Sequence, residues 1–301
     1  MRYAKPPLPF GDQLDQLEAR GLVIPDRQKA IQALSHLNYY RLRAYWLGME
    51  LPKGANGEHS FVAGASFDTA LALYVFDREL RLLVMDAIEQ VEVSVRTQWA
   101  HCLAVRYGAH AFLDRSLFFK PDLYDRTLAN LQEEIGRSQE TFIEHYRATY
   151  DDPPLPPIWA VCEVMSFGQL SKWVGNLKNR PDRQAIADAY DLDESILKSF
   201  LHHLTAIRNL CAHHSRLWNR RVTITMRIPA VRPRMARFWF NPAADRQIYN
   251  TLTMLSVMLK AIEPTTDWSK RIRALMEQFP AVQPQAMGFP TNWKTLPPWM
   301  P

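Results

Sequence analysis

The stretch TAIRNLCAHHSRLWNRR, residues 205–221, combines the apolar spacing of a helix with residue types that can do chemistry. It places Arg208 beside Asn209, and His213 beside His214. Histidine, whose ordinary pKa is about 6.5, can accept or donate a proton near neutral pH. A guanidinium stays charged and forks onto two oxygens of an anion. These groups together suit acid–base chemistry on a phosphate ester.

RNA cleavage is a reaction that needs both kinds of group. The ribose 2′-hydroxyl must lose a proton, and the leaving 5′-oxygen must gain one. The pentavalent phosphorane that forms between these two steps carries extra negative charge. His213 can serve as base or acid, and Arg208 can stabilise the phosphorane. The scheme calls for neither a metal nor another cofactor.

A helix over residues 196–214 would position these side chains, with Leu197, Phe200, Leu201, Leu204, Ile207 and Cys211 on its core side. At about 100° per residue, Asn209 and His213 share a face, so Asn209 can orient the imidazole or contact a phosphate. Arg208 lies about 140° from His213, so within one chain the two do not easily reach the same atom. Two helices related by a two-fold axis would supply both groups to one cleft, and we expect a homodimer.

Other interpretations of the same residues stay open. A metal site from Cys211, His213 and His214 is disfavoured, because Cys211 and His213 point about 160° apart on a helix and no second ligand pair is evident. The histidines could instead be hydrogen-bonded within the core, or the helix could only make a dimer. The alternative function is that of a non-catalytic RNA-binding regulator or sensor.

The positive charge of the chain is concentrated around this stretch. Residues 195–244 contain no Asp or Glu, and the rest of the chain holds 27 basic and 31 acidic residues. A field concentrated in this way attracts polyanions such as RNA, although a solvated basic face without a partner has the same signature. We expect Arg216, Arg220 and Arg221 to hold the RNA backbone. The other basic residues of the segment are Lys198, Arg208, Arg227, Arg232, Arg234 and Arg237.

The composition is that of a soluble globular protein, with 47% hydrophobic and 22% charged residues among 301. No apolar run approaches the roughly 20 residues that cross a bilayer, and the first residues lack the apolar core of a signal peptide. Three scattered cysteines, Cys102, Cys162 and Cys211, do not form a disulfide framework. We therefore expect a cytoplasmic protein with no membrane partner.

Helical spacing dominates the chain, so the expected fold class is mainly α. Residues 222–228 alternate apolar and polar types, which predicts a short strand or β-ribbon. The proline-rich residues 151–158 predict a connector that divides an N-terminal region, 1–150, from a C-terminal region, 151–301, within one integrated domain. Residues 52–64 predict a surface loop, and the irregular C-terminus should be pinned on the surface by Phe289, Trp293 and Trp299. We expect helices over residues 11–20, 26–37 and 67–105, a helix pair over 121–150, and an amphipathic helix over 245–262.

The long helix at 67–105 has one apolar stripe and one charged face. Leu80, Val84, Ala87, Ile88, Val91 and Val95 form the stripe. Glu89, Glu92 and Arg96 lie on an adjoining face. They could form ion pairs on the helix surface, or they could line a polar cleft.

Over most of its length the chain resembles the Abi family of bacterial abortive-infection proteins (AbiD/AbiF-like), which belongs to the HEPN superfamily. The resemblance rests on LNYYRLRAYW, YVFDRELRLLVMDAIEQVEVSVRTQ, PPIWAVCEVMSFGQLSKW, RNLCAHHSRLWNR and MGFPTNWKTLPPW, in that order. It implies a HEPN-like helical bundle core with additional helices. It also implies phage defence and a regulatory RNA or an antitoxin as a partner.

The resemblance carries residue roles as well. Arg208 and His213 match the R-x4-H motif of metal-independent HEPN endoribonucleases, which usually act as dimers, and Asn209 matches the polar residue after the arginine. By likeness, Glu89, Glu92 and Arg96 fall on the other core helix that borders such clefts. The extended signature of the family is matched by His214, Arg216 and Arg220.

Overall fold

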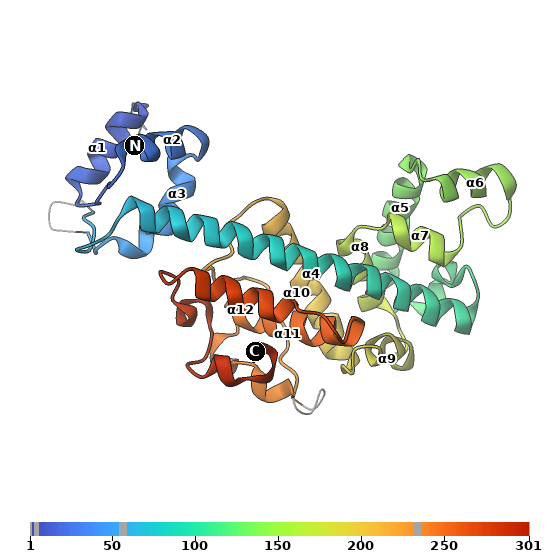
Figure 1. The fold of residues 1–301 in the computed structure, drawn as a ribbon. Helices are drawn as coiled ribbons and strands as arrows, with labels where there is room; N and C mark the ends of the chain where they lie inside the picture. The colour runs from blue at the N-terminus through green and yellow to red at the C-terminus, as the bar shows by residue number, and fades with distance from the viewer. Residues whose placement is uncertain (1, 3–5, 54–58, 231–235, 301) are drawn as a thin grey trace. The chain divides into compact units, whose positions relative to one another are not determined.

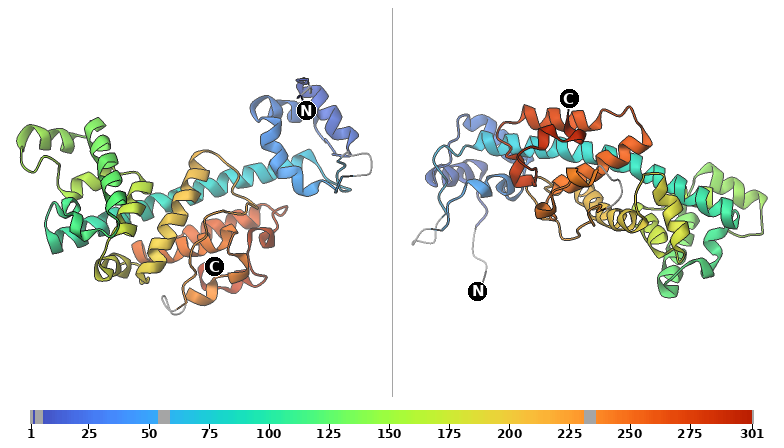
Figure 2. Two further views of the ribbon diagram at one scale, coloured as in Figure 1. Left: turned by 180° about the vertical axis from the view of Figure 1, so that it is seen from behind. Right: turned by 90° about the horizontal axis from the view of Figure 1, so that it is seen from below.

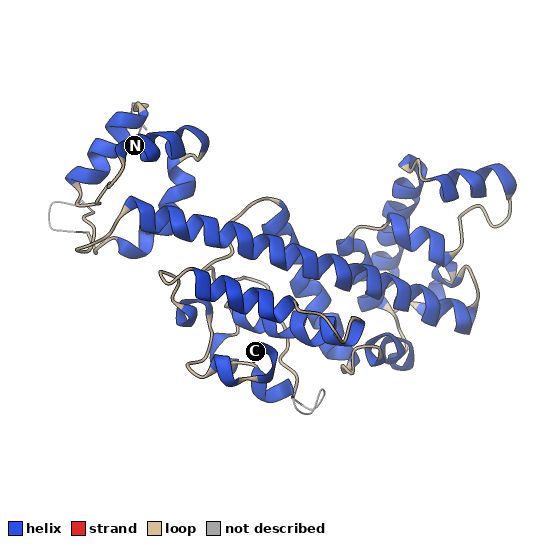
Figure 3. Cartoon of the chain, in the orientation of Figure 1, coloured by secondary structure: helices blue, strands red, loops and turns tan. Residues whose placement is uncertain are grey.

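A computed structural model of the protein describes residues 2, 6–53, 59–230 and 236–300 (Figure 1). Throughout these ranges the regular elements are helices, and the only β pairing is by isolated bridges (Figure 3). The predicted mainly α fold is confirmed. None of the helices in the same ranges has the length and apolarity needed to cross a membrane.

The chain folds as two compact units. The first comprises Met1–Leu80 and Ala274–Gln283, and the second comprises Arg81–Arg273 and Pro284–Pro301. Helix α4 (Phe67–Tyr107) contributes residues to both units, as does α12 (Trp268–Gln278). All the candidate site residues belong to the second unit.

The first unit begins with three short helices: α1 (Phe10–Ala19), α2 (Arg27–His36) and α3 (Tyr39–Trp46). Gly21 follows α1 with φ of 90°, a conformation that glycine adopts without steric cost. Asp26 caps α2, accepting a hydrogen bond from the backbone N–H of Lys29 at 2.9 Å. The helices expected at 11–20 and 26–37 are confirmed. The loop expected at 52–64 falls partly on residues 54–58, outside the described residues.

The second unit contains most of the helices. The pair expected at 121–150 is confirmed, and the proline-rich connector after it is not helical. No helix was predicted over the residues of α9 or α12. The bounds in this unit are α5 (Pro121–Arg137), α6 (Thr141–Thr149), α7 (Ile158–Val164), α8 (Phe167–Asn176), α9 (Arg180–Asp188), α10 (Glu194–Ala212) and α11 (Ile248–Ile262).

The core of the second unit is built on the apolar stripe of α4 and on aromatic side chains. The predicted stripe residues are all at most 1% exposed. Trp173 of α8 lies 5.9 Å from the ring of Trp99 on α4 and 5.0 Å from the ring of Phe118. Trp268 donates its indole N–H to the carbonyl of Leu83 at 2.7 Å, which ties α12 to α4. These contacts fix the part of α4 that carries Glu89, Glu92 and Arg96.

Helix α11 is not amphipathic, contrary to the prediction for residues 245–262. Its polar residues Asn250, Thr251, Thr253 and Ser256 are buried together with its apolar ones. Each finds a partner inside the unit: Asn250 donates to the carbonyl of Asn241 at 2.8 Å, and the Ser256 hydroxyl lies 2.7 Å from that of Ser269. Because these hydrogen bonds satisfy the polar groups, the helix can be buried on all sides.

The strand or ribbon predicted at 222–228 is wrong. Val222 and Met226 are buried while Thr223 and Arg227 are exposed, so the alternation is real. The backbone groups, however, find partners outside any ladder. The N–H of Val222 donates to the carbonyl of Arg246, and the N–H of Arg227 donates to the hydroxyl of Ser199. An extended segment laid across helices satisfies the same pattern as a strand.

The C-terminal segment is more deeply buried than predicted. Phe289, Trp293 and Trp299 are at most 4% exposed, so they belong to the core and not to the surface. Tyr249 of α11 lies 4.8 Å from the ring of Phe289, and Figure 2 shows the red C-terminal turns lying against α11. Gly288 has φ of 90°, and a Cβ there would lie 2.8 Å from the Cβ of Ala244. The close approach therefore requires glycine.

Candidate functional site

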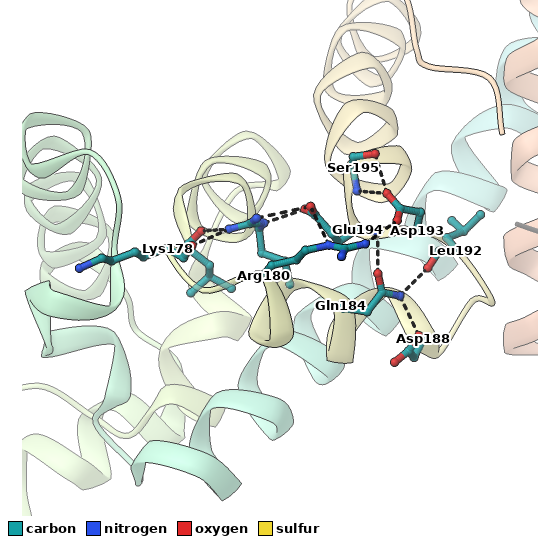
Figure 4. A network of polar contacts seen from close by, with 10 residues as sticks. Lys178, Arg180, Gln184, Asp188, Leu192, Asp193, Glu194 and Ser195 are labelled. Atoms are coloured by element: carbon teal, nitrogen blue, oxygen red, sulfur yellow. Dashed lines mark hydrogen bonds and ion pairs between the residues drawn. The ribbon is translucent and has the colours of Figure 1, made fainter. Parts of the chain in front are cut away.

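Helix α10 carries the Arg–Asn–His motif, and its first turn is anchored by a network of polar contacts (Figure 4). Asp193 caps the helix, accepting from the backbone N–H of Ser195 at 2.9 Å. Arg183 on α9 bonds the Glu194 carboxylate at 2.7 Å and donates to the carbonyl of Leu177 at 2.6 Å. The helix is thereby fixed to α9 and to the end of α8.

The core face of α10 is as predicted, with Leu197, Phe200, Leu201, Leu204, Ile207 and Cys211 all buried. His203 shares this buried face and was not singled out from the sequence. Its Nδ1 lies 2.5 Å from the carbonyl oxygen of Ile224 and its Nε2 lies 2.8 Å from the hydroxyl of Thr251. Since a carbonyl only accepts, Nδ1–H donates to Ile224. Burial lowers the pKa of His203, which favours the neutral ring, and in that state Nε2 accepts from the Thr251 hydroxyl.

The helix ends one residue earlier than His213, at Ala212. The N–H of His214 donates to the carbonyl of Cys211 and the N–H of Ser215 donates to that of Leu210, both at about 3 Å. These two bonds form a Schellman motif, in which the residue at the position of His214 has a left-handed backbone. His214 has φ of 54°, and His213 and His214 are both exposed. The motif presents two imidazoles to solvent at the end of a buried helix.

Arg208 and Asn209 lie in the last turn and a half before this end. Arg208 is half-buried, and its Nη1 donates to the side-chain oxygen of Asn209 at 3.2 Å. Asn209 is exposed, and its backbone carbonyl accepts from the N–H of His213 at 3.0 Å. The amide of Asn209 therefore contacts the guanidinium of Arg208, and its backbone lies one helical turn before His213.

On α4, Glu92 and Arg96 form a half-buried ion pair with an N–O distance of 2.5 Å. Burial raises the pKa of Glu92, while the positive charges of Arg96 and Arg208 lower it and the charge of Glu89 raises it. Arg208 on α10 therefore lies within electrostatic range of Glu92 on α4. Glu89 is exposed beside them.

Arg96 also joins α4 to the break between α7 and α8. It donates to the carbonyl of Met165 at 2.7 Å, and its Nη1 lies 3.6 Å from the Glu163 carboxylate. Glu92 and Arg96 therefore make the predicted i,i+4 ion pair. The polar cleft stays a prediction.

The arginines that follow the motif are unequally exposed. Arg221 is exposed, whereas Arg216 and Arg220 are half-buried, and Nη1 of Arg220 lies 3.5 Å from the carbonyl of Arg216. Of the other basic residues in this segment, Arg232 and Arg234 lie outside the described residues. Arg221 is thus the exposed cation that follows the end of α10, whereas the exposed Arg227 lies beside Ser199, in the first half of that helix.

Cys211 is buried on the core face, away from the two exposed histidines. In the ranges that the structure describes, no group of three or more His, Cys, Asp or Glu residues could hold a metal ion. The chemistry that the site can offer from its own side chains is proton transfer by an exposed imidazole and charge stabilisation by guanidinium groups.

The sequence model of one protein family, described as Abi-like protein, matches residues 32–219. The match includes the candidate residues on α4 and those from Arg208 to Arg216, and it ends just before Arg220 and Arg221. No curated protein matches the chain, and no solved structure does.

Proposed function

This chain belongs to the Abi-like protein family, and we propose that it is a metal-independent endoribonuclease of the HEPN kind. Membership of the family indicates a role in abortive infection, the defence of bacteria against phage. The observation that supports a nuclease most is the end of α10. There, the exposed His213 follows the Arg208–Asn209 pair by one turn, on a helix whose opposite face is core.

In the proposed reaction the ribose 2′-oxygen attacks the adjacent phosphorus and the bond from phosphorus to the 5′-oxygen breaks. His213 takes the proton of the 2′-hydroxyl and, once protonated, gives a proton to the leaving 5′-oxygen. The products are a 2′,3′-cyclic phosphate and a 5′-hydroxyl. Atoms and charge balance without a metal or a co-reactant.

Arg208 would stabilise the phosphorane, because a guanidinium forks onto two oxygens and stays charged. The charge of Arg208 lowers the pKa of Glu92, so the guanidinium lies within electrostatic range of a carboxylate on α4. Asn209, in contact with Arg208, would orient the guanidinium, the imidazole or the phosphate.

The remaining cationic residues would bind the RNA backbone without regard to sequence. Arg221 is the exposed member of the set, and the half-buried Arg216 and Arg220 precede it in the chain. His214 is a second candidate for proton transfer. Backbone binding of this kind weakens steeply as salt rises.

The test is to incubate the purified protein with RNA in EDTA and to compare it with His213→Ala. We expect the wild type to cut, the products to carry cyclic phosphate ends, and His213→Ala to lose about 10²- to 10⁴-fold in rate. The matched control is His202→Ala, which removes another exposed histidine of α10 and should cut normally.

Two results would contradict the proposal. Undiminished cutting by His213→Ala removes the assigned role of that residue. RNA that is bound with a steep dependence on salt but never cut favours the non-catalytic RNA-binding regulator.

A further inference from the structure

A pocket of about 260 Å³ opens between α6 and α7, in the second unit, outside the motif on α10. It is smaller than the roughly 300–1,000 Å³ of sites for drug-sized ligands, which suits a single flat ring system. Its lining consists of Phe142, His145, Tyr146, Pro157, Trp159, Ala160 and Glu163.

The walls of the pocket are aromatic and unusually open to solvent. Trp159 is 56% exposed and Phe142 is 39% exposed. Tyr146 is held rigidly, because its hydroxyl donates to the carbonyl of Pro153 at 2.7 Å and its ring lies 5.0 Å from that of Tyr150. Exposed aromatic faces on a fixed frame are what stacking of an unpaired nucleobase requires.

One edge of the pocket is a carboxylate. The side chain of Glu163 is 48% exposed, and one of its oxygens lies 3.6 Å from Nη1 of Arg96. Arg96 in turn pairs with Glu92, which feels the charge of Arg208. Ion pairs therefore connect the edge of the pocket to Glu92 on α4, within electrostatic range of Arg208.

A carboxylate only accepts hydrogen bonds, so it selects the base with the best donors. Guanine offers two neighbouring donors on its Watson–Crick edge, at N1 and at the 2-amino group. Adenine and cytosine place an acceptor nitrogen beside their amino group, and uracil flanks its single N–H with two carbonyls. Each of these three would bring an acceptor against Glu163.

We propose that this pocket binds an unpaired guanine of the RNA, stacked on Trp159 and hydrogen-bonded to Glu163. The identity of the ligand as RNA rests on the proposed function. The site would select where the strand lies relative to Arg208, and so which phosphodiester is presented for cleavage.

The experiment measures binding of short, fluorescently labelled single-stranded RNA, in the His213→Ala background so that the strand stays intact. Trp159→Leu should weaken binding of guanosine-containing RNA by about 5- to 100-fold, the range expected for loss of one stacked base. Trp159→Phe should retain most of the affinity. The matched control is Phe119→Leu, because Phe119 is 68% exposed and does not line the pocket.

Glu163 is tested by replacing guanosine with inosine, which lacks only the 2-amino group. The parent protein should prefer guanosine, and Glu163→Gln should reduce that preference. A duplex of the same sequence should be insensitive to Trp159→Leu, because its bases are not available for stacking.

Equal affinities for the Trp159→Leu protein and its parent would overturn the inference and would favour a protein partner for the exposed aromatic residues. Cleavage by the wild type is scored separately. Cutting without any dependence on Trp159 refutes the pocket alone, whereas Trp159-dependent binding without cutting refutes the nuclease proposal and leaves the pocket.

Discussion

His214 has a left-handed backbone, with φ of 54°, at the residue that follows the cap of α10. Glycine is the usual residue at this position of a Schellman motif, because a side chain there costs roughly 1–2 kcal/mol. Local strain of this kind persists where the surrounding structure imposes it, and it is often found at functional sites. The exposed imidazole is thus presented at some cost to the fold.

Two substitutions separate the backbone of His214 from its side chain. His214→Gly and His214→Ala both remove the imidazole, but only the glycine relieves the backbone strain. We expect the glycine variant to be more stable than the alanine variant by about 1 kcal/mol in urea unfolding. Identical unfolding midpoints would show that the backbone at this residue is not strained.

His203 gives the protein a dependence of stability on pH. Burial lowers its pKa below the ordinary 6.5, so the unfolded chain binds a proton that the folded chain does not. The contribution of the neutral ring is complete above about pH 6.5 and is lost as the pH falls through the interval between 6.5 and the lower, folded-state pKa. His203→Gln cannot titrate, so its free energy of unfolding should fall less steeply on acidification. Parallel curves of urea midpoint against pH for the two proteins would contradict this.

At the scale of single residues, the sequence showed which residue types occur at which spacing. It did not show which residues far apart in the chain form hydrogen bonds. Arg208, Asn209 and His213 could be selected as site candidates because the functional group of each side chain shows what chemistry it can do. His203 lies on the same buried face as Phe200 and Leu204, and helical periodicity could have placed it there. Its hydrogen-bond partners, Ile224 and Thr251, come from separate segments that no local pattern joins to it.

Helix α10 is the element on which the proposed site depends, because one end is anchored and the other carries the motif. Asp193 caps the anchored end, and its bonds to Ser195 and the nearby Arg180 lower its pKa. Loosening of the anchored end should therefore displace the motif at the other end of the helix.

Removal of the cap tests this anchoring. Asp193→Ala should lower the free energy of unfolding by about 1 kcal/mol, because a backbone N–H of the first turn loses its acceptor. Asp193→Asn keeps an oxygen acceptor and serves as the matched control, with a smaller loss. If the two variants unfold at the same urea concentration, the cap contributes nothing specific.

Helices were predictable wherever one apolar face repeated, as in α4 and α10. Two of the errors share a physical origin. The polar residues of α11 find partners such as Ser269 and Asn241, so they can be buried together with the apolar residues of the helix. The 222–228 segment alternates like a strand because it lies on helices, and its N–H groups bond elsewhere. Both outcomes depend on tertiary contacts rather than on local pattern.

At the scale of the whole molecule, the division into two units could not be predicted from helix-breaking residues in the sequence. One boundary between the units falls within α4, a continuous helix of 41 residues, and another falls within α12. No glycine or proline marks either point, since the helix itself continues through it. The candidate site residues nevertheless all fall in one unit, which is consistent with a single site per chain.

The proposed active site is shared between two copies of the chain. Arg208 lies on the last turns of α10, half-buried and bonded to Asn209, and His213 follows at the exposed end of the helix. We propose that one copy supplies the guanidinium and its partner supplies the imidazole. Each dimer would then contain two such composite sites.

The most direct measurement is RNA cleavage by a co-expressed mixture of Arg208→Ala and His213→Ala chains. Each variant alone should be inactive. In a mixed dimer, one site receives Arg208 from the His213→Ala chain and His213 from the Arg208→Ala chain, so the mixture should recover up to about a quarter of wild-type activity. A mixture that forms dimers and stays as inactive as either variant, while the wild type cuts, would contradict the shared site.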